Sequence, residues 1–345
     1  MRFGVPYQGS KNKIAEWIID NLPEDEILVD LFAGGCAVTH AAMLSGKWNK
    51  VIANDIGDAP EVFCNAILGK YADEKRWISR EDFQNLKDTD PYVSICWSFG
   101  NNRRNYLYGK EIEPWKKALH YARVFGDCSL LREMGIDSDG SSDDVLKHHD
   151  EYKEKYIRWW LSKQKDIFLD SNKLITNDKL NIKENKDKRG QYFISSLKKS
   201  ELKSIEKLQR AQRFELVQHL SRAKRLQSLQ SLQTYKNNLT VYRKSYADAA
   251  IPDNAVVYAD PPYKGTDISS YKCEFDYGEF ENWLAAVPFI VIVSEYNAPA
   301  GCVEIASIKK QSTFAQGNKG GTNTEKLFVQ ERFYNEYLEK MGRLF

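Results

Sequence analysis

Short apolar runs near the two ends of the chain have the length and the β-branched content of buried strands. We expect strands at residues 27–31, 50–53, 239–242, 255–259, 289–293, 303–308 and 326–329. Apolar positions at helical spacing predict helices at residues 11–21, 37–44 and 280–286. The first two strands and the last five would then form one α/β sheet with a long insertion.

The insertion is charged and has a largely helical pattern. Within it, residues 175–190 are so polar that they are expected to be a loop or a flexible linker. The expected domains are therefore residues 1–76 together with 238–345, which carry the sheet, and residues 77–237, which form the mostly helical insertion.

A basic helix is expected near the end of the insertion. Residues 198–225 carry nine Lys or Arg against three Glu, with apolar residues at helical spacing. This helix should bury its apolar face and expose its basic face. Two interpretations of the basic face stay open: a solvated surface and a phosphate-binding surface. Leu226, Leu229 and Leu232 continue the apolar spacing, so the end of the helix is expected to pack rather than to bind.

Composition narrows the function classes. The chain has 345 residues with 50 basic and 48 acidic side chains, so any affinity for nucleic acid must come from local clusters of charge. No apolar run has membrane-spanning length and no signal peptide is recognisable, which predicts a cytoplasmic protein without membrane contacts. The six cysteines form no CxxC pair, so reduced and mostly buried thiols are expected, and no metal site.

A strand, a glycine turn and a helix form half of a nucleotide-binding unit at residues 27–44. The second strand ends at Asp55, 21 positions after Gly34, where a Rossmann-like fold contacts ribose hydroxyls. Because no full GxGxxG is present, a nucleoside cofactor without phosphates fits better than a dinucleotide. A nicotinamide-dependent oxidoreductase, or a simple tight turn, stays open on this motif alone.

The first turn of the chain, VPYQGSKNK at residues 5–13, leads into the helix expected at residues 11–21. Ser10 is the expected N-cap of that helix. Free backbone amides at the helix start, with Lys11 beside them, favour binding of a carboxylate. A capped surface helix is the alternative.

The sequence YADPPY at residues 258–263 ends a buried strand with a stiff corner. Asp260 supplies a carboxylate, Pro261 a bare carbonyl, and Tyr263 an aromatic face, with Pro262 completing the corner. Two acceptors that take the hydrogens of an exocyclic amino group localise its lone pair on nitrogen, and the aromatic ring can stack on the base. A polar loop after a core strand is the alternative.

Residues 91–108 interleave aromatic side chains with asparagines and arginines, a composition suited to phosphates and base edges. The candidate DNA-binding residues are Asn101, Arg103, Arg104 and Tyr106. The alternative is a turn with ordinary solvated arginines.

Taken together, these motifs resemble the amino-group DNA methyltransferases of the DNA adenine methylase family. The similarity is carried by PYQGSK at residues 6–11, DLFAGGCAV at 30–38, NDI at 54–56, KSYADA at 244–249, and YADPPY. It covers about the first 75 and the last 105 residues and departs at Cys36, where many relatives have glycine.

The resemblance implies a Rossmann-like class I methyltransferase sheet with its last strand antiparallel and a mostly helical inserted target-recognition domain. It implies that S-adenosylmethionine is the cofactor and double-stranded DNA the partner. The cofactor-binding residues expected from the matching motifs are Tyr7, Lys11, Asp30, Phe32, Ala33, Gly34, Asp55, Asp248 and Asp260.

The expected function is methylation of the N6 amino group of adenine flipped out of duplex DNA, with Asp260, Pro261, Pro262 and Tyr263 as the catalytic residues. N4-cytosine methylation and a catalytically inactive DNA-binding relative stay open. The sequence leaves the recognition site, the oligomeric state and membership of a restriction-modification system undecided.

Overall fold

The protein is described from a computed structural model that covers residues 2–163, 206, 208, 216–263, 275–311 and 322–343. The chain divides into two compact units. The first unit consists of Met1–Glu74, Glu81–Asn105 and Arg222–Phe345, and the second consists of Lys75–Arg80 and Tyr106–Ser221.

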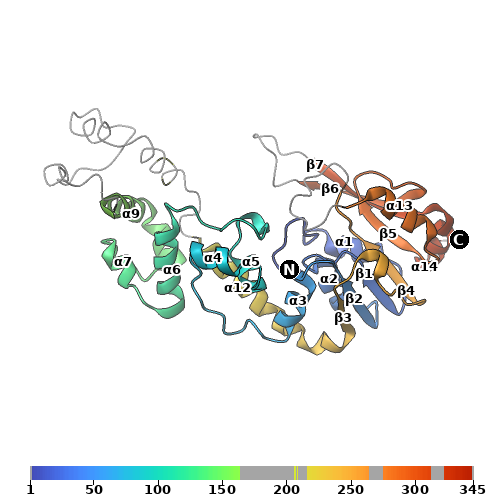
Figure 1. Cartoon of the computed structure of the whole chain (residues 1–345), viewed down its shortest axis with the longest axis horizontal. Helices are drawn as coiled ribbons and strands as arrows, with labels where there is room; N and C mark the ends of the chain where they lie inside the picture. Colours follow the sequence, from blue (N-terminus) through green and yellow to red (C-terminus); the bar gives the residue numbers. More distant parts are fainter. Residues whose placement is uncertain are drawn as a thin grey trace. The chain divides into compact units, whose positions relative to one another are not determined.

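Seven strands, all in the first unit, make one mixed sheet in the described residues, in the order β3-β2-β1-β4-β5-β7-β6 (Figure 1). They are β1 (Ile27–Asp30), β2 (Lys50–Asn54), β3 (Leu239–Tyr242), β4 (Ala255–Ala259), β5 (Val291–Glu295), β6 (Cys302–Gln311) and β7 (Thr322–Gln330). Strands β1 to β5 pair in parallel, whereas β7 runs antiparallel to both β5 and β6. The expected Rossmann-like sheet is confirmed, with β5 starting two residues later than the apolar run suggested.

The pattern of apolar residues explains the sheet. Every residue of β4 and β5 is buried, as in the covered centre of a parallel sheet, whereas the edge strand β3 is half-buried throughout. Helix α2 (Ala37–Ser45) packs on β1 and β2, α3 (Ala59–Ile67) on β3, and α14 (Tyr334–Lys340) on β7. The carboxyl ends of β1, β2 and β4 therefore lie side by side at one edge of a well-packed sheet.

The N-terminal helix is shorter than expected. Helix α1 comprises Ala15–Asp20, and its N-cap is Ile14, so the predicted helix start at Lys11 and the predicted cap at Ser10 are wrong. The preceding residues form turns, and the amide of Ile14 donates to the carbonyl of Lys11. Lys11 therefore lies before the helix, in the turn that leads into it.

The basic helix of the insertion is described only from its C-terminal part, α12 (Gln218–Ser228), followed by the 3-10 segment η3 (Leu229–Asn238). Most of residues 198–215 lie outside the described residues. The expectation that the end packs is confirmed, because its three leucines are at most 3% exposed. Arg222 and Arg225 donate to backbone carbonyls of the first unit, so these two cations bind protein groups.

The described elements of the second unit are helical. They are α6 (Glu113–Phe125), α7 (Ser129–Glu133), α8 (Ser142–Lys147) and α9 (His149–Lys163), packed around Trp115, Leu119 and Tyr156. The second unit differs in extent from the expected insertion 77–237, because residues 81–105 and 222–237 belong to the first unit. The polar loop expected at 175–190 lies outside the described residues.

The remaining described elements include α4 (Arg80–Leu86), α5 (Pro91–Cys96), η1 (Phe99–Asn101), η4 (Tyr246–Asp248), α13 (Tyr277–Ala286) and η5 (Glu331–Phe333). In the ranges that the structure covers, no helix is long and apolar enough to cross a membrane.

Five cysteines lie in the described residues and are free thiols: Cys36, Cys64, Cys96, Cys128 and Cys302. The sixth, Cys273, lies outside the described residues. Two of the five are buried and three are half-buried. No cluster of three metal-ligating side chains occurs in the part of the chain that the structure describes.

Candidate active site

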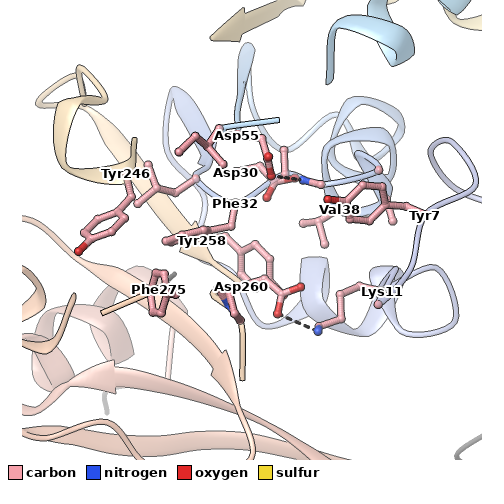
Figure 2. Close-up of a pocket in the computed structure, with 18 of the residues that line it drawn as sticks. Tyr7, Lys11, Asp30, Phe32, Val38, Asp55, Tyr246, Tyr258, Asp260 and Phe275 are labelled. Atoms are coloured by element: carbon pink, nitrogen blue, oxygen red, sulfur yellow. Dashed lines mark hydrogen bonds and ion pairs between the residues drawn. The ribbon is translucent and has the colours of Figure 1, made fainter. Parts of the chain in front are cut away.

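A cavity of about 250 Å³ lies at the carboxyl ends of β1, β2 and β4 (Figure 2). It collects residues from six separate stretches of the first unit. They include Tyr7, Lys11, Asp30, Phe32, Ala33, Gly34, Val38, Asp55, Ile56, Lys244, Tyr246, Tyr258, Asp260, Pro262, Phe275 and Glu279. Every expected cofactor-binding residue except Asp248 lines it. Asp248 is exposed on η4, and Tyr246 from the same turn lines the cavity instead.

The glycine turn after β1 forms one wall of the cavity. The amide of Gly34 donates to Oδ2 of Asp55 at 2.8 Å, and the amide of Gly57 donates to Oδ1 at 2.7 Å. Burial raises the pKa of Asp55, and these two amides partly offset that effect. Asp55 is thus held rigidly by backbone groups at the end of β2.

The turn requires close contacts and a backbone conformation that residues other than glycine rarely allow. A side chain at Gly35 would begin 2.5 Å from Cβ of Tyr7, so only glycine lets Tyr7 approach. Cys36 has φ 56° and is fully buried, a left-handed backbone conformation that glycine adopts more readily than other residues. The small cysteine side chain nevertheless fits at the start of α2.

Asp30 is a buried carboxylate at the end of β1. Its Oδ2 accepts hydrogen bonds from the amide of Thr39 at 3.0 Å and from its hydroxyl at 2.6 Å. Burial raises its pKa to about 7, although the two bonds from Thr39 act in the opposite direction. Asp30 therefore changes charge near neutral pH, on the wall of the cavity.

The corner after β4 is joined to the N-terminal turn by a buried ion cluster. Lys11 Nζ lies 2.7 Å from Oδ1 of Asp260 and 3.3 Å from Oε1 of Glu325, which comes from β7. Figure 2 shows Lys11 reaching across the cavity wall to the carboxylate of Asp260. The predicted carboxylate-binding capacity of Lys11 is thus used by two carboxylates of the chain itself.

Burial sets the protonation of this cluster. Burial lowers the pKa of Lys11, but the charges of Asp260 and Glu325 outweigh it and the pKa is raised. Burial raises the pKa of Asp260, Lys11 lowers it and Glu325 raises it, so the result stays above the ordinary value. Lys11 therefore stays protonated, and Asp260 binds a proton more readily than a carboxylate in water does.

Tyr263 is largely enclosed, with 8% of its surface exposed. Its hydroxyl donates to Glu325 and lies 2.9 Å from Oγ of Ser294, and Lys11 Nζ sits 4.4 Å from the centre of its ring. The ring of Tyr296 meets it edge-on at 4.6 Å. In this conformation Tyr263 does not present the open stacking face that the sequence led us to expect, because its polar tip finds partners on β5 and β7.

Pro261 faces a different space from its neighbours. Asp260 and Pro262 line the main cavity, whereas Pro261 lines a second cavity of about 130 Å³ with Tyr277, Phe280 and Glu295. The hydroxyl of Tyr277 donates to the carbonyl of Tyr263 at 2.9 Å. The corner therefore separates the two cavities: Pro261 lines the second cavity, and the residues before and after it line the main one.

The four candidate DNA-binding residues have different surroundings. Arg103 is half-buried, and its guanidinium donates to Asp58 and to Oγ of Ser94. Tyr106 is 6% exposed in the second unit, and its hydroxyl donates to the carbonyl of Ile78. These contacts occupy the groups that we expected to face DNA.

Arg104 and Asn101 remain nearer to solvent. Arg104 is exposed and Asn101 is half-buried, in a loop where Asn101 has φ 59° and Arg103 has φ 58°. The side chain of Asn102 closes this loop by accepting the amides of Arg104 and Asn105. Of the four candidates, Arg104 is the one whose residue is exposed.

Sequence reasoning missed Glu325, Ser294, Tyr246 and Phe275. A signal existed for Glu325, because it shares the alternate positions of β7 with the buried residues Leu327 and Val329. The aromatic residues Tyr246 and Phe275 lie 5.5 Å and 5.8 Å from Phe32, centre to centre, on the side of the cavity opposite Lys11 (Figure 2).

Comparison with known proteins gives one family match and one curated relative. Residues 7–128 match the model of the D12 class N6 adenine-specific DNA methyltransferase family. A curated relative, the type II methyltransferase M2.HphI of Haemophilus parahaemolyticus, is 49% identical over 53 residues. That match spans 15% of this chain and 15% of the relative.

The family match extends beyond the first 75 residues, so it includes the polar loop that carries Arg103 and Arg104. The match ends before the corner at Asp260. The fold brings Asp260 into the same cavity as Gly34 and Asp55, which lie within the match. Over residues 7–128, the chain is therefore similar to the D12 class N6 adenine-specific DNA methyltransferase family.

Proposed function

We propose that this protein transfers a methyl group from S-adenosylmethionine to the N6 amino group of an adenine flipped out of duplex DNA. One observation carries the proposal. Asp260, the acceptor for an amino group, lines the same cavity as the glycine turn and Asp55. A nucleoside-type site and an amino-group site thus share one space.

The cavity fits the cofactor in charge and in surface. Asp30, Asp55 and Asp260 place carboxylates around it, which suits a ligand that carries a sulfonium and an ammonium group. Phe32 and Ile56 offer apolar surface for a purine, and Ile56 is 55% exposed. Asp55 would hold ribose hydroxyls and Asp30 the ammonium group.

Bound S-adenosylmethionine supplies an electrophilic methyl group: its carbon–sulfur bond breaks with the electrons going to sulfur, a carbon–nitrogen bond forms, and the nitrogen loses one proton. The chain's own residues prepare the amino group for this. The carboxylate of Asp260 accepts one amino hydrogen, and the carbonyl of Pro261 is proposed to accept the other. The raised pKa of Asp260 makes it a better acceptor and a destination for the released proton.

The target base must leave the duplex, which costs a few kcal/mol. We propose that Tyr263 stacks on the flipped base once the corner opens, and that contacts with DNA phosphates offset part of the cost. Because Tyr263 is enclosed in the described structure, this role requires its ring to become accessible when DNA binds.

The similarity to a type II methyltransferase supports a role for this protein in a restriction-modification system.

The exposed loop gives a testable DNA contact. Arg104→Ala should weaken duplex binding and reduce the slope of log affinity against log salt by about 0.9 for one lost phosphate contact. Arg103→Ala should leave the slope unchanged, because its guanidinium is bound by Asp58 and Ser94. Fluorescence anisotropy of a labelled duplex across a salt series measures both. Equal slopes for wild type and Arg104→Ala would place the phosphate contact elsewhere.

The function itself is tested by its product. Unmethylated plasmid is incubated with the protein and isotope-labelled S-adenosylmethionine, then digested to nucleosides for mass spectrometry. We expect labelled N6-methyladenine. Labelled N4-methylcytosine would correct the base and keep the chemistry, whereas DNA binding without label in any nucleoside would indicate a catalytically inactive relative.

A further inference from the structure

We propose that Glu325 is a positioning residue for methyl transfer, which holds Lys11 and Tyr263 so that Asp260 keeps its capacity to accept hydrogens from the target amino group. This inference rests on the proposed function and adds a residue from the far end of the chain to it. Glu325 lies on β7 and is 1% exposed. A carboxylate buried to this degree requires compensating partners, and all those described belong to the corner or face it.

The contacts of Glu325 lead to Asp260 by two routes. Through the first, Oε1 of Glu325 lies 3.3 Å from Lys11 Nζ, which lies 2.7 Å from Asp260. Through the second, Oε1 accepts the hydroxyls of Tyr263 and of Ser294, the latter at 2.8 Å. Glu325 therefore binds both the cation and the aromatic residue that border the acceptor.

The distances indicate a shared cation. Lys11 carries one positive charge between two carboxylates, so each carboxylate is only partly neutralised. If Glu325 were neutral, Lys11 would bind Asp260 alone and draw electron density from the oxygens that must accept the amino hydrogens. Glu325 thus competes for Lys11 and keeps Asp260 basic.

Other groups also face Asp260. Asp30 on β1 and Tyr258 on β4 lie near enough to interact with its charge, and Tyr263 belongs to the same corner. Asp30 adds negative charge in the same sense as Glu325, whereas the two phenols are neutral at physiological pH because their pKa values are raised. Lys11 is the cation among these neighbours, so its division between the two carboxylates controls the basicity of Asp260.

The decisive variant is Glu325→Gln, which keeps the shape and an acceptor for Tyr263 and Ser294 but removes the charge. We expect kcat to fall about 10- to 100-fold, with KM for S-adenosylmethionine changed by less than about twofold. The acid limb of the kcat–pH profile should move to lower pH by about one unit, because loss of a nearby negative charge lowers the pKa of Asp260. A purely structural role for Glu325 would leave that limb in place.

Two further variants complete the test. Glu325→Asp keeps the charge and should give a kcat and an acid limb between those of wild type and Glu325→Gln. Glu304→Gln is the matched control, because Glu304 lies on the neighbouring strand β6 in a surface ion pair with Lys326. It should match wild type in both measurements.

The outcomes separate this inference from the proposed function. If wild type and Glu304→Gln make no N6-methyladenine, the proposed function fails. If they do and Glu325→Gln keeps the wild-type kcat and acid limb, the role of Glu325 is refuted and the function stands. Circular dichroism and thermal unfolding check the fold. Should Glu325→Gln not fold, Glu325→Asp carries the test, and a wild-type profile in that variant overturns the proposal.

Discussion

Asp260→Ala is expected to lower kcat for methyl transfer by at least about 10²- to 10³-fold, because it removes the carboxylate that accepts the amino hydrogen and the released proton. The variant should stay folded. Lys11 keeps Glu325 as an ionic partner, so no buried cation is left without compensation. The cost to the free energy of unfolding should be about 1–3 kcal/mol, the range for a lost hydrogen bond to a charged group.

Asp253→Ala provides the control for this result. Asp253 is exposed in the loop before β4, so its loss should change neither kcat nor stability measurably. Labelled-methyl incorporation into duplex DNA gives kcat, and urea unfolding gives stability, for both variants. Wild-type turnover in Asp260→Ala would remove Asp260 from the mechanism, and with it the reason for assigning amino-group chemistry to this corner.

The sheet could be predicted from the sequence because each strand has a local signal. Buried parallel strands such as β4 are continuous apolar runs, and the strand ends are marked by residues that stop such a run. Parallel pairing of β1 with β2 and β4 then brings Gly34, Asp55 and Asp260 to one edge without any further information. This is why most of the cavity lining could be anticipated from motifs far apart in the chain.

Partners that are distant in sequence could not be predicted in this way. Arg103 looks like a DNA-binding residue in its own stretch, but Asp58 lies beside it in the fold and binds its guanidinium. Tyr263 looks like an exposed aromatic residue after two prolines, but the hydroxyl of Ser294 and the carboxylate of Glu325 are within its reach. Local composition cannot show which charged or aromatic groups the fold will enclose.

The N-terminal turn is another case in which partners distant in sequence could not be predicted. The sequence left a carboxylate-binding segment and a capped surface helix both open at Lys11, and assigned this residue to the start of a helix. In the structure the helix begins later, and Lys11 binds carboxylates from β7 and from the corner after β4. The chemistry of a lysine could be predicted from its neighbours in sequence, whereas its partners depend on the pairing of β5 with β7 and on the path of the chain after β4.

Lys11→Met is expected to give the largest loss of stability, about 3–5 kcal/mol at pH 8, because it leaves Asp260 and Glu325 buried together without a cation. The loss should shrink as pH falls. Without Lys11 the pKa of Asp260 in the folded state rises further above its unfolded value, so the destabilisation is full above that raised pKa and is relieved as protonation removes the repulsion. Urea unfolding near pH 5.5, 7 and 8.5 measures it, with the exposed Lys13→Met as the control. A loss equal at all three pH values would mean that Lys11 stabilises by packing alone, and that the two carboxylates do not share its charge.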